Sequence, residues 1–208
     1  MKKASLAAVA AVLMSTTAAH AQNMTPFAEM PAGDYALDLS HASLIWKVSH
    51  MGLSNYAGRF TNFEGTLTLD PADPASSAIS VTIDPSSVET DYPGTSKDWN
   101  AELADKENWF NSDAFPEISF VSTGIELTGD NTGVLTGDLT FLGITKPATL
   151  DVTFNGAFAE RPFSGLPTIG FSATGSLMRS DWGLDYLTPG IGDGVQLLIE
   201  AEFEQDDE

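Results

Sequence analysis

The chain has 208 residues, with 29 acidic against 9 basic side chains and a formal charge of −20 at pH 7. A negative field of that size repels phosphate backbones and anionic lipid surfaces, which argues against nucleic acid as a partner. The chain has no cysteine. Its stability must therefore come from core packing and backbone pairing, without disulfides.

The first 21 residues have the pattern of a secretory signal peptide. Basic Met1-Lys2-Lys3 precedes an apolar run from Ala4 to Met14, and Ala19-His20-Ala21 is a small-x-small cleavage motif. The apolar run is shorter than the roughly 20 residues of a membrane-spanning helix. We predict cleavage near Ala21, export to the periplasm and no stable membrane insertion. Cleavage removes two lysines, which leaves 7 basic residues and moves the formal charge from −20 to −22.

Most of the remaining chain alternates apolar and polar residues with a period of two. This alternation predicts strands that have one buried face and one face in water. The alternating apolar sets are Tyr35/Leu37/Leu39, Leu44/Trp46/Val48, Leu67/Leu69, Ile79/Val81/Ile83, Ile118/Phe120, Leu135/Leu139/Phe141, Leu150/Val152/Phe154, Ile169/Phe171/Ala173 and Val195/Leu197/Ile199/Ala201/Phe203.

Turn-forming residues separate several of these strands. Gly129-Asp-Asn-Thr-Gly133 and Asp193-Gly194 are hairpin signals. The segment Gly143-Ile-Thr-Lys-Pro147 is predicted to be a turn in which the glycine allows the bend and the proline ends the strand pairing.

Two stretches depart from this pattern. Ser96 to Phe110 places Trp99, Leu103 and Phe110 on one helical face, with Ser96 as the candidate cap, and predicts a helix across an opening of the sheet. The stretch from His50 to Gly65 mixes aromatic residues with glycines and polar residues. That mixture favours the mouth or lining of a cavity over a plain strand.

About eight antiparallel strands with little else must protect their edges, and closure into a barrel does so completely. We therefore predict an all-β fold, namely a lipocalin-like antiparallel barrel with a short helix across an opening. The interior of such a barrel can be filled by side chains or can hold one small ligand.

Four blocks of the sequence, in order, resemble the YceI-like family of exported proteins. They are His50-Met-Gly-Leu-Ser with Gly58-Arg-Phe60 and Phe63-Glu-Gly65; the segment from Phe110 to Phe120; Gly137-Asp-Leu-Thr-Phe-Leu-Gly143-Ile-Thr-Lys-Pro147; and Ile169-Gly-Phe171 leading to Arg179-Ser-Asp-Trp182-Gly. The resemblance covers nearly the whole mature chain.

This resemblance implies a lipocalin-like barrel with a long interior pocket for a polyisoprenoid or another long-chain lipid. It also sets the expected domains: signal peptide 1–21, N-terminal arm 22–32, YceI-like barrel 33–204 and acidic tail 205–208. The strong negative charge of the chain disfavours a diphosphate head group.

A lipid tail would need large apolar contacts inside the barrel, and its head group a polar partner near the mouth. The predicted tail contacts are Trp46, Val48, Phe60, Phe63, Val81, Phe110, Phe115, Phe120, Phe141, Phe171, Met178 and Trp182. The predicted head-group contacts are His50, Arg59 and Arg179. Each has an alternative interpretation: the aromatic residues can be ordinary core, Arg179 can form an ion pair near Asp181, and His50 can bond a backbone carbonyl.

Other kinds of chemistry have weak signals. His41 and His50, even with Asp38, do not form a compact metal-ligand pattern, and we expect neither a metal nor a catalytic group. Gly190-Ile-Gly-Asp-Gly194 lacks the spacing of a phosphate-binding loop.

Two hypotheses about function remain. The first is a non-enzymatic periplasmic carrier that holds a polyisoprenoid or fatty lipid, with no other cofactor and with homodimer formation possible. The alternative is an enzyme or redox-accessory protein that acts on a quinone-like isoprenoid in the same barrel.

Overall fold

A computed structural model of the chain describes residues 24–205. The predicted signal peptide and the last residues of the acidic tail lie outside this range. The strands are β1 (Gly33–Leu37), β2 (Ser43–His50), β3 (Ser54–Phe60), β4 (Phe63–Leu69), β5 (Ala78–Ile83), β6 (Val88–Glu89), β7 (Ile118–Gly129), β8 (Thr132–Phe141), β9 (Ile144–Phe158), β10 (Thr168–Met178) and β11 (Ile191–Glu204). The helices are α1 (Trp99–Asp105) and the 3-10 turns η1 (Phe27–Glu29), η2 (Leu39–His41), η3 (Pro74–Ser76), η4 (Pro85–Ser87) and η5 (Arg179–Trp182).

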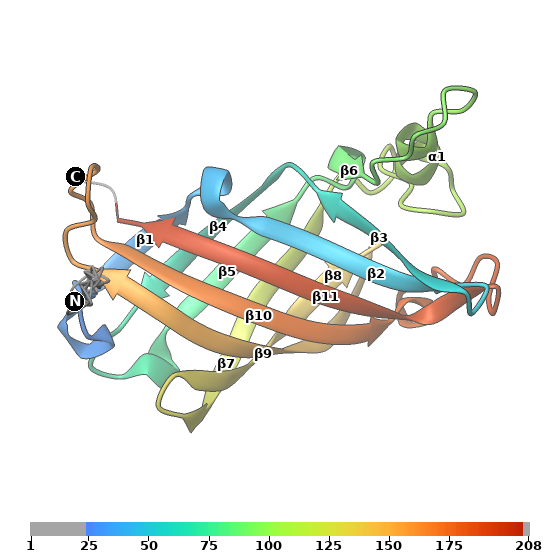
Figure 1. Ribbon diagram of the computed structural model, residues 1–208. Helices are drawn as coiled ribbons and strands as arrows, with labels where there is room; N and C mark the ends of the chain where they lie inside the picture. The colour runs from blue at the N-terminus through green and yellow to red at the C-terminus, as the bar shows by residue number, and fades with distance from the viewer. Residues whose placement is uncertain (1–23, 206–208) are drawn as a thin grey trace, which may run out of the picture.

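The strands form a closed antiparallel barrel, as predicted. Eight strands follow one another around it in the order β1-β4-β5-β7-β8-β9-β10-β11, and β11 closes the ring on β1. Strands β2, β3 and β6 extend the wall beyond this ring, because β11 pairs with β1 near its end and with β2 over most of its length. Figure 1 shows the long strands wrapping around a common interior.

The period-two pattern directs every second side chain of a strand into the barrel. In β2 the buried residues are Leu44, Trp46 and Val48, and the residues between them are more exposed. Strand β7 is irregular, because its pairing with β8 shifts register between Ser122 and Gly124. A β-bulge of this kind moves the cavity-facing side of the strand from even to odd positions, so that Ile125 and Leu127 line the cavity, although Leu127 near the strand end remains 57% exposed.

The turns match the predictions in part. Asp130 and Asn131 connect β7 to β8 as expected. The β8–β9 turn lies at Leu142 and Gly143, which both have positive φ, and not at residues 143–147. Pro147 lies inside β9 opposite Asp138, and the prediction that it ends the pairing is wrong. The pairing of β9 with β10 extends only to Leu150, so no strand pairs with Pro147 on that side. The N–H that proline lacks is therefore not required for a hydrogen bond to β10.

Two further expectations are corrected by the fold. Asp193-Gly194 is not a hairpin turn, because β11 runs through it and its register against β2 shifts there. The stretch from His50 to Gly65 consists mainly of β3 and the start of β4, so it is strand, although alternate side chains of both strands do face the interior.

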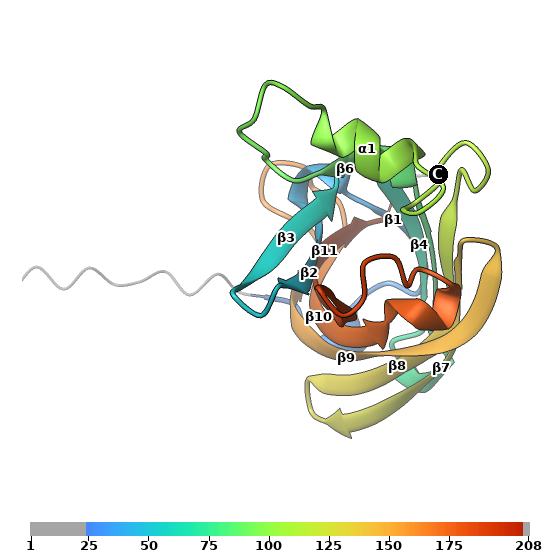
Figure 2. The same ribbon diagram turned by 90° about the vertical axis from the view of Figure 1, so that its right-hand side faces the viewer.

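The helix is shorter than predicted. It spans Trp99–Asp105, and the Asp98 side chain accepts a hydrogen bond from the Ala101 N–H, so Asp98 and not Ser96 is the cap. Figure 2 shows α1 beside β6, at one end of the barrel. Leu103 on α1 and Phe110 in the turn after it both pack into the interior. The prediction of a short helix across an opening is therefore confirmed.

Two clusters of buried apolar side chains occupy the two ends of the barrel. The helix-end cluster lies beneath α1 and consists of Leu44, Trp46, Val48, Phe60, Phe63, Ile83, Val88, Leu103, Ala104, Trp109, Ile118, Phe141, Trp182 and Leu184. The far-end cluster lies around β1 and the C-terminal end of β11 and consists of Met30, Tyr35, Leu67, Leu69, Ala157, Ile169 and Phe203. Within residues 24–205, no helix has the length and apolar character that crossing a membrane requires.

The candidate ligand cavity

A cavity of about 510 Å³ runs through the interior between these two ends. Trp109 and Leu184 line it at the helix end, and Phe27, Pro71 and Leu127 line it toward the other end. Its size lies within the ordinary range of small-molecule sites, about 300–1,000 Å³. Its lining is almost entirely apolar, which suits a ligand that has a long apolar chain.

The wall of the cavity is built by the inward residues of the barrel strands. Even positions of β9 and odd positions of β8, β10 and β11 face it, as strand alternation requires. The lining residues from these strands include Leu135, Leu139, Leu150, Val152, Phe154, Phe171, Ala173, Leu177, Val195, Leu197 and Ile199.

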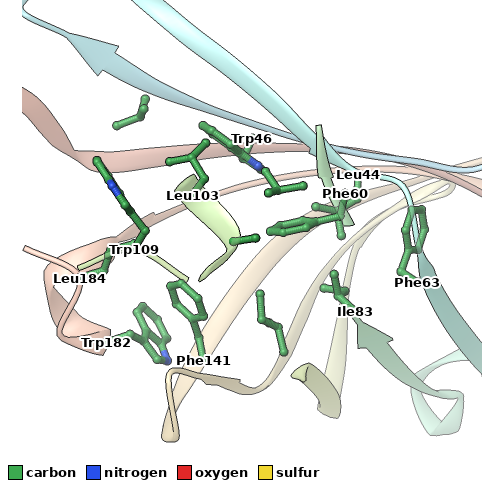
Figure 3. Close-up of a cluster of buried hydrophobic side chains, with 14 residues drawn as sticks. Leu44, Trp46, Phe60, Phe63, Ile83, Leu103, Trp109, Phe141, Trp182 and Leu184 are labelled. Carbon is green, nitrogen blue, oxygen red and sulfur yellow. The ribbon is translucent and has the colours of Figure 1, made fainter. Parts of the chain in front are cut away.

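Aromatic side chains gather at the helix end of this cavity. Phe110, from the turn after α1, packs against Trp46, Phe60 and Phe141 with ring centroids 5.4 to 6.3 Å apart. Figure 3 shows Trp46, Phe60, Phe141 and Leu103 directed into the same interior. Three strands, β2, β3 and β8, therefore meet around the ring of Phe110.

Most of the predicted tail contacts line the cavity. They are Trp46, Val48, Phe60, Phe63, Val81, Phe110, Phe120, Phe141 and Phe171. Arg179, a predicted head-group contact, also lines it. The structure places the other five predicted residues elsewhere.

Three of those five are apolar or aromatic. Met178 is exposed, because its neighbour Leu177 holds the inward position on β10. Trp182 is buried outside the lining, and its indole N–H donates to the Leu139 carbonyl at 3.1 Å. Phe115 packs on Gly143 in the β8–β9 turn, where a Cβ would lie 2.8 Å from the phenyl ring.

The remaining two are polar and lie on the outer surface. His50 is exposed at the end of β2. Arg59 points outward from β3 and pairs with Asp91 at 2.7 Å. Hydrogen bonding to Asp91 and burial act oppositely on the Arg59 pKa, and the hydrogen bond prevails and raises it. Neither position supports the predicted contact with a lipid head group.

Arg179 is buried, and its guanidinium is engaged by the loop that follows it. It donates to the carbonyls of Gly192, Leu184, Tyr186 and Ile191 and to the Thr188 hydroxyl, at 2.6 to 3.0 Å. Burial lowers the Arg179 pKa. Asp181, the alternative partner considered from the sequence, pairs instead with Lys146 at 3.5 Å. The main visible role of Arg179 is to hold residues 183–192 against the barrel end.

Sequence reasoning missed many lining residues because it selected aromatic side chains. Leu139, Leu197 and Ile199 line the cavity, although the sequence identified them only as members of strands. The signal that could have found them was already present. In a barrel, every inward position of an alternating strand faces the same interior.

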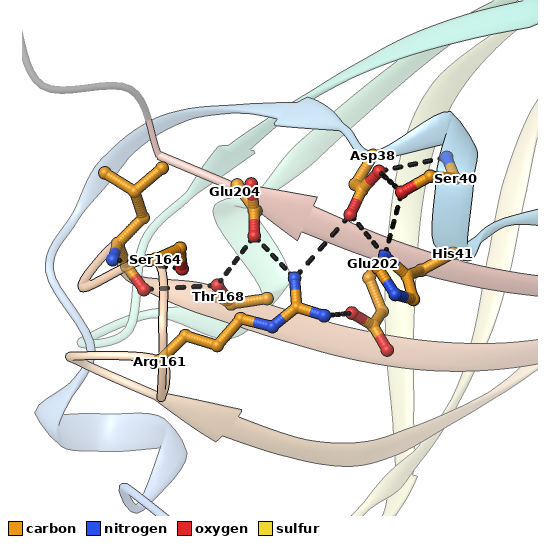
Figure 4. Close-up of polar contacts among 9 residues, drawn as sticks. Asp38, Ser40, His41, Arg161, Ser164, Thr168, Glu202 and Glu204 are labelled. Atoms are coloured by element: carbon orange, nitrogen blue, oxygen red, sulfur yellow. Dashed lines mark hydrogen bonds and ion pairs between the residues drawn. The ribbon is translucent and has the colours of Figure 1, made fainter.

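A polar network lies on the outside of the barrel, at the end opposite α1. The Arg161 guanidinium contacts Glu204 at 2.5 Å, Glu202 at 2.9 Å and Asp38 at 3.6 Å. His41 Nδ1 lies 2.6 Å from the Asp38 carboxylate (Figure 4). Asp38, His41 and Glu202 could each bring one ligand atom to a metal ion. The Arg161 guanidinium already neutralises two of these carboxylates, so the arrangement fits an ion-pair network better than a metal centre.

The Asp38 carboxylate has a shifted pKa. Partial burial raises it, but hydrogen bonds from Ser40 and His41 outweigh burial and hold the pKa at about 2. Asp38 also accepts from the Ser40 N–H and so caps η2, the short turn between β1 and β2.

Comparison with known proteins places the chain in a family. The YceI-like domain matches residues 35–203. A UPF0312 protein of Pseudomonas putida is 38% identical over 155 residues, which cover 74% of this chain and 77% of that protein. The crystal structure of Burkholderia cenocepacia BcnA superposes with a TM-score of 0.68 and 26% identity, covering 80% of this chain and 98% of BcnA.

A more distant solved structure has the same fold. It is described as a polyisoprenoid binding domain from Saccharophagus degradans, and it superposes with a TM-score of 0.55 and 14% identity. The match covers 83% of this chain and 98% of that domain.

Proposed function

The chain belongs to the YceI-like domain family, and from that premise we propose that it binds one long-chain lipid, of the polyisoprenoid or fatty type, inside its barrel. The observation that carries the proposal is the continuous apolar lining of the cavity from α1 to the opposite end of the barrel. A distant structure of the same fold, which is described as polyisoprenoid-binding, supports this ligand class.

The driving force follows from the chemistry of the lining. Each methylene moved from water into such a cavity is worth roughly 0.8 kcal/mol. Side chains of the opposing strands, such as Phe120 on β7 and Leu197 on β11, would contact the tail along its length. The nine predicted tail contacts that line the cavity are the residues we propose for this role.

The biological setting is part of the same proposal. We propose that the protein acts as a carrier in the periplasm after cleavage near Ala21. The N-terminal residue of the protein isolated from that compartment tests the cleavage site, and a start near Gln22 is expected. The possible homodimer is tested by light scattering of the same preparation.

A substitution that fills part of the cavity with a larger side chain tests lipid binding directly. Ala173 on β10 lines the cavity, whereas Ala57 on β3 is exposed on the outer face. Ala173→Phe should reduce the lipid recovered per chain at least tenfold. The added ring takes the place of roughly six to seven buried carbons of the tail, whose burial is worth about 5 kcal/mol, or more than a thousandfold in affinity. Ala57→Phe should leave recovery unchanged. The measurement is mass spectrometry of lipids extracted from protein purified out of the periplasm.

Two results would oppose the proposal. If Ala173→Phe keeps the wild-type melting temperature and still retains a full complement of lipid, the lipid is not inside the barrel. If purified wild-type protein turns over a quinone-like isoprenoid with saturable kinetics, the alternative hypothesis of an enzyme or redox-accessory protein replaces that of a carrier.

A further inference from the structure

Two buried polar atoms at the helix end of the cavity have no hydrogen-bond partner within residues 24–205. They are the indole Nε1 of Trp46 and the hydroxyl of Tyr56. Trp46 is 9% exposed and lines the cavity. A buried donor left unpaired costs about 1–3 kcal/mol, so such groups are rare without a functional reason.

The two side chains come from adjacent strands and face the same interior. The β2–β3 pairing sets Trp46 opposite Gly58 and Val48 opposite Tyr56, so Trp46 and Tyr56 are diagonal neighbours. Their ring centroids are 6.3 Å apart. The Trp46 ring lies over Gly58, in the space where a Cβ would be, and any side chain there would displace the indole.

The same chain shows what ordinary buried indole and phenol groups do. The Trp182 indole donates to the Leu139 carbonyl at 3.1 Å. The Tyr35 hydroxyl donates to the Pro31 carbonyl at 2.7 Å. Trp182, Tyr35 and Tyr56 lie outside the cavity lining, and Trp46 lies in it. Of the two groups without a partner among the described residues, Trp46 therefore lines the cavity, and Tyr56 packs against the same cluster as its neighbour.

We propose that Trp46 and Tyr56 bind a neutral oxygen acceptor on the lipid, such as the carbonyl of a quinone, ketone or ester. The inference rests on the proposed lipid binding and adds the chemistry of the head group to it. An indole N–H only donates, so its partner must be an acceptor, and one carbonyl oxygen has two lone pairs for two donors.

The surroundings explain why a neutral group suits this position. Both donors are uncharged, and the guanidinium of Arg179, the cation that lines the same cavity, donates to backbone carbonyls and the Thr188 hydroxyl. A carboxylate or phosphate would lose its hydration here without gaining a free cation. The rest of the lining is apolar and accommodates the tail toward the opposite end of the barrel.

Phe110 is the side chain that must move away from Trp46 when the oxygen binds. It packs edge-on against Trp46 and also contacts Phe60. It belongs to the turn after α1 and to no strand, so it can rotate without breaking the barrel pairing.

A competition between two matched ligands tests the proposal. Protein is equilibrated with micelles that hold equal amounts of a seventeen-carbon methyl ketone and the seventeen-carbon alkane, and the bound ratio is measured by gas chromatography with mass spectrometry. Wild type should enrich the ketone about tenfold, the effect of one to two hydrogen bonds. Trp46→Phe and Tyr56→Phe should each lower the enrichment, and the double variant should abolish it.

Trp182→Phe and Tyr35→Phe are the matched controls, because they remove the same atoms where each has a protein partner. They should lower the melting temperature of the lipid-free protein and leave the ketone enrichment unchanged. Trp46→Phe and Tyr56→Phe should leave that melting temperature unchanged or raise it, because each removes an unpaired buried polar atom.

Three outcomes are informative in different ways. Undiminished enrichment in the folded double variant overturns the head-group inference and leaves lipid binding intact. A melting temperature that falls in Trp46→Phe and Tyr56→Phe as far as in the controls also overturns it, because the donors would then already be paired. Failure of the wild type to bind either ligand overturns the proposed function itself.

Discussion

The two ends of the barrel differ in how completely they are packed and paired. In the far-end cluster, Ile169 is 0% exposed and Tyr35 is 1% exposed with its hydroxyl bonded. In the helix-end cluster, Trp46 is 9% exposed, and its indole N–H has no partner within the part of the chain that the structure describes. Packing at native density with every polar group paired stabilises one conformation. At the helix end, we propose that a bound lipid completes the pairing of the buried donors.

This difference indicates that the two ends of the same sheet have different roles: the far end closes the barrel, and the helix end is where we propose that the ligand is bound. The far end holds the chain closed, with β1 joining β4 to β11 and with Arg161 pairing on the outside. The helix end is covered by α1 and the segment after it, which are not part of the barrel wall. The following predictions test this comparison, from the largest expected effect to the smallest.

The largest effect is expected from the fully buried isoleucine of the far end. Ile169→Ala should lower the free energy of unfolding by about 3–4 kcal/mol, because it leaves a cavity in close-packed surroundings. Ile199→Ala is the matched change at a residue that already faces the ligand cavity, and about 1 kcal/mol is expected there. Urea denaturation of the lipid-free proteins measures both. Equal losses would show that the two regions are packed alike.

The Arg161 network should come next. Arg161→Gln leaves Asp38, Glu202 and Glu204 close together without their shared cation, and we expect a loss of about 1–2 kcal/mol, limited by the partial exposure of these groups. Lipid binding should not change, because the network lies outside the cavity. Arg161→Lys is the control that keeps the charge without the planar guanidinium. A change in lipid affinity in Arg161→Gln would mean that the two ends are coupled.

The smallest effect concerns pH at the same end. The Asp38 pKa is about 2 in the folded protein, below its ordinary value of 3.8, so folding favours the ionised form. This contribution, about 1 kcal/mol after allowance for partial exposure, is fully present above about pH 5 and is lost as the pH falls toward 2. Asp38→Asn should flatten the decline of stability across that interval relative to wild type. Urea denaturation at each pH measures this decline. If the stability of Asp38→Asn falls as steeply as that of wild type, Asp38 is not the source of the decline.

Much of the fold could be predicted from local patterns. The period-two sets gave the strands, and the surplus of strands with unprotected edges indicated a closed barrel. Predictions failed where a neighbouring strand decided the outcome. Pro147 stays inside β9 because β10 does not pair there. Asp193-Gly194 stays in β11 because β10 pairs with Gly194 and β2 pairs on either side of the two residues.

The residues of the candidate site were likewise predictable in part. The sequence by itself determined that the chain alternates apolar and polar residues, and so that an apolar interior exists, because alternation is a property of neighbouring residues. It also identified Trp46, Phe60 and Phe110 as large groups available to that interior. Only the tertiary structure decided that Met178 faces water and that Arg179 is engaged by carbonyls. It alone showed that, among the residues described, Trp46 and Tyr56 have no hydrogen-bond partner, because hydrogen-bond pairing depends on groups that are distant in the chain.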